Sequence, residues 1–513
     1  MSLMRGKYVS FSVLTLLFIV LLLGVIPQKT YAASKTYYEI APGDSVLITH
    51  SYDSSISFPI TGDKFDYAHY GYNGEAYYGE NQKSNWYRIF PGYRMIVSNT
   101  SSSTVILECS YASLNVRRTS TPALMKKWLA PGQSVIASGR NNNSLESFRI
   151  DGRHDRANYK SGIIYSFSTD RYGEYQRIPT GESMVITNRD TTGYNVYGPY
   201  ETVSFTERTA PAVLHWTLQP GETLQAVNHA KNSFNVYHDN ARHEYALYDG
   251  HGNLSSYGIN TSTYTMSPSE RLIMTNRNKN SMEVKFPYDA FTVSSHTSPA
   301  LFTKTIKNGE SLHIFNKNNK SYTLSFEGTY DFVEYNENGK VGRYGKDVTT
   351  SSKSISAGSS IVITKTGSGM VEVIGPPDVL TVTNRENPAL FTYALAPGAS
   401  MEATNMGTSL TNVYVTGKNY SALYDSSKEL KIYEHFTWPS GQNVGVGERL
   451  AVQNADVSDI VVYGPYDVFR VQGRTNPVTF KKTVAPGVSI EAKNDTKERL
   501  PLNVSGLHDY VKY

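Results

Sequence analysis

The chain has 513 residues, of which 18% are charged, and its 49 Lys and Arg against 45 Asp and Glu give a formal net charge of +4 at pH 7. So small a net charge gives no electrostatic reason to expect nucleic acid or an anionic membrane as a partner. A single cysteine excludes an internal disulfide framework, and the 39 Gly and 39 Tyr favour many short strands and turns.

The N-terminus has the three-part layout of a secretory signal peptide. Arg5 and Lys7 precede an apolar run over residues 11–27, and the small residues of "TYAA" offer cleavage after Ala32 or Ala33. An uncleaved membrane anchor is the alternative, because the run approaches spanning length. We expect residues 1–33 to be removed and no integral membrane segment to remain. A secreted chain of this size without disulfides is typical of bacteria, so we expect it at a Gram-positive cell surface.

One turn motif repeats along the rest of the chain. "APGDSVLITH" at Ala41 returns as "APGQSVIASG" at Ala130 and "APGVSIEAKN" at Ala485, with variants between them. The turn residues are spaced alternately by 49 and 40 positions, with one step of 48, so a long and a short unit recur together about every 89 residues. The turn position is held by Gly43, Gly92, Gly132, Gly181, Gly221, Ser269, Gly309, Gly358, Gly398, Gly447 and Gly487.

Apolar residues flank each turn at the spacing of half-buried strands. Around Gly181, Ile178 lies three positions before the turn residue, and Met184 and Ile186 lie three and five positions after it. Pro-Gly favours a type II turn with Gly at positive φ, and we interpret it as a hairpin that joins adjacent units. Long units gain a further hairpin, whose tips read "YGYNGE", "YDGHGN" and "YNENGK".

A long and short pair has the size of a two-sheet sandwich domain, whereas one unit buries too little apolar surface to fold alone. We therefore predict an all-β chain of tandem antiparallel β-sandwich modules forming an elongated rod. The alternatives are a continuous β superhelix and a propeller-like ring, although rings typically have about 4 to 8 blades. The predicted modules 1 to 5 are 34–121, 122–210, 211–298, 299–387 and 388–476, and 477–513 is a partial module 6.

The sequence carries no familiar catalytic or zinc-binding motif, such as "GxSxG" or "HExxH". Cys109 lies in the apolar stretch "VILECSY" and is interpreted as a buried strand residue rather than a reactive thiol. His238, Asp239, His243 and Glu244 cluster in one unit only, which favours loop variation over a metal site. We predict no enzyme activity, no catalytic residue, no metal and no cofactor, although paired carboxylates for glycoside hydrolysis are recognisable only in three dimensions.

Tyrosines recur at fixed positions of the repeat. Short units carry "YGPY" or a relative of it, which places Tyr111, Tyr200, Tyr288 and Tyr466 in one column. The tyrosines of the long units form a second column, which either belongs to the sandwich core or presents rings for stacking on sugars or on a neighbouring protein. These candidate binding residues are Tyr70, Tyr159, Tyr248, Tyr335, Tyr424 and Tyr513.

Both ends of the repeat array predict self-association. Tyr513 lies 89 residues after Tyr424, so residues 477–513 read as three strands of an incomplete module. This segment either packs on module 5 as a cap or presents an open edge. The stretch from Lys35 to Ile40 aligns with strands that close short units, and we expect it to be free to complete the last unit of another copy.

The regular repeats favour a secreted structural or adhesive component of the bacterial surface or extracellular matrix. Its partners would be glycans, surface proteins or further copies of the chain. The first alternative is a multivalent, lectin-like carbohydrate-binding protein, in which weak sites gain avidity by repetition. The second is a polysaccharide-active enzyme built on a sandwich scaffold.

Overall fold

The computed structural model describes residues 35–513 except 73, 110–113, 141–145, 240–241, 260–262, 327, 350–351, 369, 497–498 and 513. The predicted signal peptide therefore lies outside the described residues. Within them the strands form ten antiparallel sheets, and the one helical element is a 3₁₀ turn, η1 (Tyr288–Ala290). None of their helices is long and apolar enough to span a membrane. The predicted all-β fold is confirmed.

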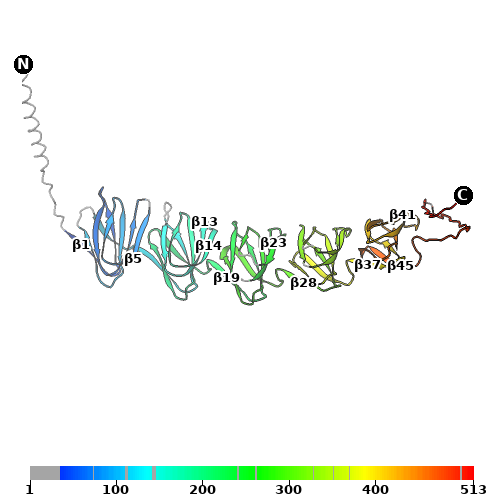
Figure 1. Ribbon diagram of the computed structural model, residues 1–513. Helices are drawn as coiled ribbons and strands as arrows, with labels where there is room; N and C mark the ends of the chain where they lie inside the picture. Colours follow the sequence, from blue (N-terminus) through cyan, green and yellow to red (C-terminus); the bar gives the residue numbers. More distant parts are fainter. Residues whose placement is uncertain are drawn as a thin grey trace, which may run out of the picture. The chain divides into compact units, whose positions relative to one another are not determined.

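Each module is a sandwich of nine strands, divided between a four-stranded and a five-stranded sheet (Figure 1). Every sheet draws its strands from one module, as tandem modules require and a continuous superhelix does not. By its contacts the chain divides into two compact units. The first comprises Met1–Leu214 and Pro287–Asp289, and the second His215–Phe286 and Ala290–Tyr513.

The strands recur at equivalent positions in the five modules. Module 1 contains β1 (Thr36–Ile40), β2 (Ser45–His50), β3 (Ile56–Thr61), β4 (Phe65–Tyr70), β5 (Ala76–Gln82), β6 (Asn85–Ile89), β7 (Arg94–Asn99), β8 (Val105–Cys109) and β9 (Leu114–Thr119). Module 2 contains β10 (Leu124–Leu129), β11 (Ser134–Gly139), β12 (Glu146–Ile150), β13 (His154–Lys160), β14 (Ile163–Arg171), β15 (Glu174–Ile178), β16 (Glu182–Asn188), β17 (Tyr194–Pro199) and β18 (Val203–Arg208).

Modules 3 to 5 repeat this order of strands. Module 3 contains β19 (Val213–Leu218), β20 (Thr223–Asn228), β21 (Phe234–His238), β22 (His243–Tyr248), β23 (Leu254–Ile259), β24 (Tyr264–Met266), β25 (Arg271–Asn276), β26 (Met282–Pro287) and β27 (Phe291–His296). Module 4 contains β28 (Phe302–Ile306), β29 (Ser311–Asn316), β30 (Tyr322–Phe326), β31 (Tyr330–Tyr335), β32 (Val341–Val348), β33 (Ser352–Ile355), β34 (Ser360–Lys365), β35 (Val371–Gly375) and β36 (Leu380–Arg385). Module 5 contains β37 (Leu390–Leu395), β38 (Ser400–Asn405), β39 (Thr411–Val415), β40 (Asn419–Tyr424), β41 (Leu430–Phe436), β42 (Ser440–Val444), β43 (Arg449–Asn454), β44 (Ile460–Pro465) and β45 (Phe469–Arg474).

The pairing of strands divides each module into two interleaved halves. In module 5 the sheet orders are β37-β44-β39-β42 and β41-β40-β43-β38-β45. Every neighbouring pair in these sheets joins one of the first four strands to one of the last five, and the other four modules follow the same rule. Neither half of a module therefore forms a strand ladder on its own.

The repeated turns have the predicted backbone conformation but join different elements from those expected. All eleven turn residues have φ between 65° and 84°, and the Asp44 N–H donates to the Ala41 carbonyl at 3.0 Å across the first turn. The hairpin interpretation is wrong, because β1 lies in the four-stranded sheet and β2 in the five-stranded sheet. Both strands bury apolar residues in one core from opposite sides, so the turn crosses the sandwich.

The interiors of the modules contain the apolar residues that flank the repeated turns and were predicted to be buried. In module 1, Ile40, Ile48, Ile89 and Val97 are fully or almost fully buried in one cluster. Cys109 belongs to the same cluster, and burial raises the pKa of its thiol to about 11. Such a pKa keeps the thiol protonated near neutral pH, as expected for a structural cysteine.

The predicted long-unit hairpins are present as β4–β5, β22–β23 and β31–β32. The expectation for the two ends needs correction. β1 is not a spare strand, because it pairs with β8 from Thr36 opposite Cys109 to Ile40 opposite Val105. The alignment misled because it placed this strand at the end of a preceding unit, whereas it opens module 1. The three strands expected within residues 477–513 are not formed in the described part of that segment.

Candidate functional site

The tyrosines of the long units lie at the end of the fourth strand of each module. Tyr70, Tyr159 and Tyr248 are buried, with 2%, 7% and 0% of their surface exposed, while Tyr335 and Tyr424 are partly exposed. Tyr513 lies outside the described residues. Burial favours the structural interpretation of this column, and the binding interpretation stays a prediction.

In the first compact unit, the side chains around Tyr70 join module 1 to module 2. The Arg94 guanidinium stacks on the Tyr70 ring at 5.1 Å from the centroid and pairs with the Glu201 carboxylate at 2.5 Å. The Ala123 N–H, in the connection between the modules, donates to the Ser98 hydroxyl at 2.7 Å. Ala123 is fully buried. The two modules therefore share an ion pair and a buried hydrogen bond, and the Tyr70 ring supports the arginine of that pair within module 1.

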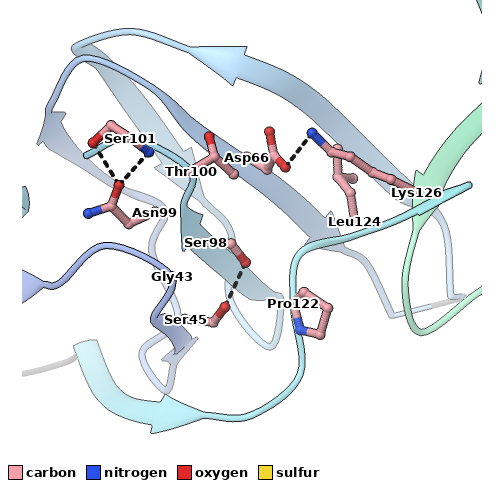
Figure 2. A pocket seen from close by; sticks show the side chains of 10 residues that line it. All are labelled: Gly43, Ser45, Asp66, Ser98, Asn99, Thr100, Ser101, Pro122, Leu124 and Lys126. Atoms are coloured by element: carbon pink, nitrogen blue, oxygen red, sulfur yellow. Dashed lines mark hydrogen bonds and ion pairs between the residues drawn. The ribbon is translucent and has the colours of Figure 1, made fainter. Parts of the chain in front are cut away.

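A pocket lies beside this connection, and Figure 2 shows the side chains that line it. Its charged pair is Asp66, only 3% exposed, and Lys126, whose Nζ lies 2.9 Å from the Asp66 carboxylate and 2.7 Å from Glu80. Burial alone would lower the pKa of Lys126, but hydrogen bonds to Glu80 and Asp66 outweigh it, and the net pKa is raised. Lys126 stays protonated and links module 2 to module 1.

Tyr159 is the equivalent tyrosine of module 2 and also lies in the first compact unit. Its hydroxyl donates to the Asp289 carboxylate at 2.6 Å, and Arg208 binds both oxygens of that carboxylate at 2.6 and 2.7 Å. Burial, followed by the hydrogen bond to Asp289, raises the pKa of Tyr159 well above its ordinary value. The phenol therefore remains a donor to the carboxylate over the ordinary pH range.

The second unit holds two further sites of this kind. Arg271 stacks on Tyr248 at 4.1 Å from the ring centroid and pairs with Asp378 at 3.1 Å. The Tyr335 hydroxyl donates to Asp467 at 2.9 Å. Arg385 binds that same Asp467 carboxylate.

We define a junction site as this set of a fourth-strand tyrosine, an arginine and a carboxylate. The carboxylate always comes from the turn between the eighth and ninth strands of a later module. The arginine occupies either the position of Arg94 and Arg271 or the position of Arg208 and Arg385. At the other of these two positions, each of modules 1 to 4 has Ser, Thr or His. The four junction sites are Tyr70–Arg94–Glu201, Tyr159–Arg208–Asp289, Tyr248–Arg271–Asp378 and Tyr335–Arg385–Asp467.

A column of buried carboxylates serves the backbone of the modules. The N–H groups of Asn81, Asp170 and Asp347 donate to these carboxylates at 2.8 to 2.9 Å, although the donors are non-glycine residues with φ of 49°, 53° and 50°. Each donor lies next to a register shift between the fourth and fifth strands. The acceptors are Asp66, Asp155 and Asp331, and Glu244 of the "HDNARHE" cluster occupies the equivalent position in module 3.

Buried asparagines form a second structural column, which our reasoning from the sequence missed. Asn99 Nδ2 donates to the carbonyls of Ile40 and Ser103, both at 2.7 Å, while its Oδ1 accepts the Ser101 N–H at 2.9 Å. The signal was the Asn that ends many of the ten-residue turn repeats. The equivalent residues are Asn188, Asn228, Asn276, Asn316, Asn405 and Asn454.

The histidines of module 3 also have a structural explanation. His243 is 1% exposed, and its Nε2 contacts the Tyr264 hydroxyl, while the His238 ring centroid lies 4.3 Å from that of His243. In the part of the chain that the structure describes, no three His, Cys, Asp or Glu side chains are grouped to hold a metal ion.

No protein-family model matches this chain, and a search of curated proteins finds no match.

Proposed function

We propose that this protein is a secreted structural component of a bacterial cell surface or extracellular matrix, without enzymatic activity. The junction site carries the proposal. One arginine, one carboxylate and one tyrosine recur at it four times, and the ion pair connects one module to the next. In a repeat protein, such nearest-neighbour contacts make each module more stable than it would be alone.

The chemistry of the junction suits a chain that carries load. Removing one partner of a partly buried ion pair leaves the other charge uncompensated, so modules separate only at an energetic cost. The Arg208 side chain is 19% exposed and its Asp289 partner 33%, so solvent screens this pair only in part. Buried carboxylates often belong to catalytic sites in enzymes. In this protein the buried carboxylates of Asp66, Asp155 and Asp331 accept backbone N–H groups at β-bulges.

Immunogold labelling of the source bacterium, with fractionation of its culture, tests the proposal. We expect the protein outside the membrane, in the wall or matrix fraction, with an N-terminus near Ala33 or Ser34 by intact mass. Retention in the cytoplasm with Met1 in place would contradict it. Hydrolysis of a polysaccharide by the purified protein would contradict the absence of enzyme activity.

Multivalent glycan binding is a second candidate, favoured by exposed rings outside the tyrosine column. On the four-stranded sheets of modules 1 and 2, Trp86 is 68% exposed, Trp128 58% and Tyr175 61%. Flat sheet faces with exposed rings suit stacking on sugar planes. Retention on polysaccharide beads that is lost in a Trp86→Ala, Trp128→Ala double variant, but not in Trp438→Ala, would support this candidate. Equal retention of all three proteins, or none, would reject it.

A further inference from the structure

Module 1 departs from the repeat where its β4–β5 hairpin meets the turn between β6 and β7. Four rings contact one another there, with Tyr93 at the centre. The ring centroid of Tyr93 lies 5.3 Å from that of His69 and 6.1 Å from that of Tyr72. Phe90 is the fourth ring, at 5.5 Å from Tyr93. Tyr72 is 77% exposed and Phe90 43%, so this ring cluster reaches the surface.

The other modules form the same contact between hairpin tip and turn without these rings. The Gly71 N–H donates to the Glu75 carbonyl at 2.8 Å, and the hairpins of modules 3 to 5 have the same bond at the first residue of the tip. At the position of Tyr72, these three modules have Gly250, Glu337 and Ser426. At the position of Tyr93, modules 2 to 5 have Glu182, Glu270, Ser359 and Glu448. The architecture of a module therefore does not require the rings.

Module 1 also lacks two hydrogen bonds that module 5 makes at these positions. In module 5 the Asp425 carboxylate accepts a backbone N–H within the hairpin tip at 2.8 Å, and the Glu448 carboxylate accepts the Gly445 N–H at 2.7 Å. Module 1 has Gly71 and Tyr93 in place of these two acids. Departures from local stabilising rules are expected at functional sites, so the ring cluster has the character of a binding surface.

Two glycines fix the positions of the exposed tyrosines. A Cβ on Gly71 would lie 3.1 Å from the Tyr93 ring, and a Cβ on Gly92 would lie 2.3 Å from the Tyr72 ring. Gly92 is required by its φ of 71° in any case, whereas Gly71 does not have a positive φ. The absence of a side chain at Gly71 therefore makes room for Tyr93. Rings held in place before binding lose little entropy when a ligand stacks on them.

The charges at the cluster favour a neutral ligand. Burial lowers the pKa of His69, so all four rings are neutral near pH 7. The Arg88 guanidinium lies 5.2 Å from the centroid of Phe90, and the Ser55 hydroxyl binds it at 2.6 and 2.9 Å. Because a cation already covers this ring, a second cation would be repelled from it.

The size of the cluster favours a small ligand. An aromatic side chain presents about 150–250 Å², so the exposed parts of Tyr72 and Phe90 add up to on the order of 200–300 Å². A specific protein interface covers about 800 Å² on each partner. The exposed rings therefore suit a few sugar units rather than the surface of a folded protein.

We propose that the ring cluster of module 1 binds a neutral carbohydrate. Tyr72 and Phe90 stack on the apolar faces of the sugar rings, and the phenols of Tyr72 and Tyr93 can each donate and accept a hydrogen bond with sugar hydroxyl groups. Because the cluster is built in module 1 alone, the chain has one such site, in contrast to the multivalent candidate above. The site does not depend on the structural role of the junction sites.

Binding of neutral oligosaccharides to the chain from Ser34 is the first test. An array of glucose, galactose and N-acetylglucosamine oligomers supplies the probes, and calorimetry with the most strongly bound oligomer gives the affinity and the stoichiometry. We expect one oligosaccharide per chain. Failure of every neutral oligomer to bind would overturn the proposal, as would saturable binding of tetramethylammonium in their place.

A double variant locates the site. Tyr72→Ser with Tyr93→Glu introduces the residues that module 5 has at these positions, so module 1 should stay folded. We expect an affinity at least about 10-fold lower, since two rings are lost. Trp438→Ala removes a ring of similar exposure from module 5 and should have no effect. Full binding by the double variant, with loss of binding in Trp86→Ala, would place the sugar on the four-stranded sheet and contradict the proposal.

Gly71→Asp tests the position of the ring without removing it. The new Cβ would press on Tyr93, and the new carboxylate could make the bond that Asp425 makes in module 5. We expect an affinity at least about 3-fold lower, together with a thermal unfolding midpoint that is unchanged or higher. An unchanged affinity would show that the arrangement of the rings is not what the sugar recognises.

Discussion

At the scale of single residues, several fixed side chains support the backbone rather than a ligand. Asn99 donates from one amide to the buried Ile40 carbonyl and to the less buried Ser103 carbonyl, and Asp66 accepts an N–H from a residue at positive φ. Buried polar groups of this kind are costly when they lose their partners. The recurrence of these residues therefore reflects the needs of turns and bulges.

Replacing Asn99 by Ala tests this role. The substitution leaves the Ile40 and Ser103 carbonyls without their donor, so we expect module 1 to lose about 1–3 kcal/mol of unfolding free energy. Hydrogen exchange of the amides of β2 and β7 measures it. Asn115 is exposed on β9, and Asn115→Ala should change the stability of module 1 by less than about 0.5 kcal/mol. Equal effects of the two variants would refute the assignment.

Gly221 tests the turn geometry. Its φ is 82°, and no atom lies within 4 Å of the place that a Cβ would take, so the backbone rather than a clash resists substitution. Gly221→Val should destabilise module 3 by about 1–3 kcal/mol. Gly221→Asn should cost less, because Asn tolerates positive φ better. An unchanged thermal unfolding profile for the Val variant would show that the strain is absent.

At the scale of elements, the sequence predicted strands and turns better than their connections. Pro-Gly turns and alternating apolar residues are local signals. The positive φ of Gly181 and the burial of Ile178 could therefore be predicted from the neighbouring residues in the sequence alone. Which sheet a strand joins depends on partners many residues away, as for Thr36 and Cys109. The hairpin interpretation failed for that reason, and the junction sites could not be foreseen.

The junction between modules 4 and 5 allows a double-mutant cycle. Arg385→Met and Asp467→Asn should each lower the stability of module 5, with a coupling of about 1 kcal/mol between them. Hydrogen exchange in β38 and β43 gives the free energies. Arg470 is exposed on β45, so Arg470→Met should show no coupling to Asp467→Asn. Additive effects of Arg385→Met and Asp467→Asn would mean that the ion pair does not stabilise the junction.

At the scale of the whole molecule, buried tyrosines govern the response to alkali. Burial raises the pKa of Tyr194, Tyr248 and Tyr322 above the ordinary value of 10.0. In the unfolded chain these phenols lose their protons near pH 10, whereas in the folded chain they keep them. The unfolded state therefore binds fewer protons above pH 10, and stability falls as the pH rises.

Thermal unfolding followed by circular dichroism tests this pH dependence. The midpoint should be nearly constant from about pH 7 to pH 9 and should fall steeply between about pH 10 and pH 12. In a parallel record of phenolate absorbance, the part that comes from the buried tyrosines should appear together with unfolding instead of preceding it. A constant midpoint up to pH 12 would contradict the predicted linkage.

The central claim is that the junction sites join the modules into an array that carries load. Single-molecule stretching of the chain from Ser34 tests it most directly, in comparison with a variant that carries Arg94→Met, Arg208→Met, Arg271→Met and Arg385→Met. We expect five unfolding events, each adding about 25–30 nm of contour length, since Thr36–Thr119 and its equivalents unravel as units. The forces should be lower in the variant while the length increments stay the same. Equal forces in the two proteins would contradict the account.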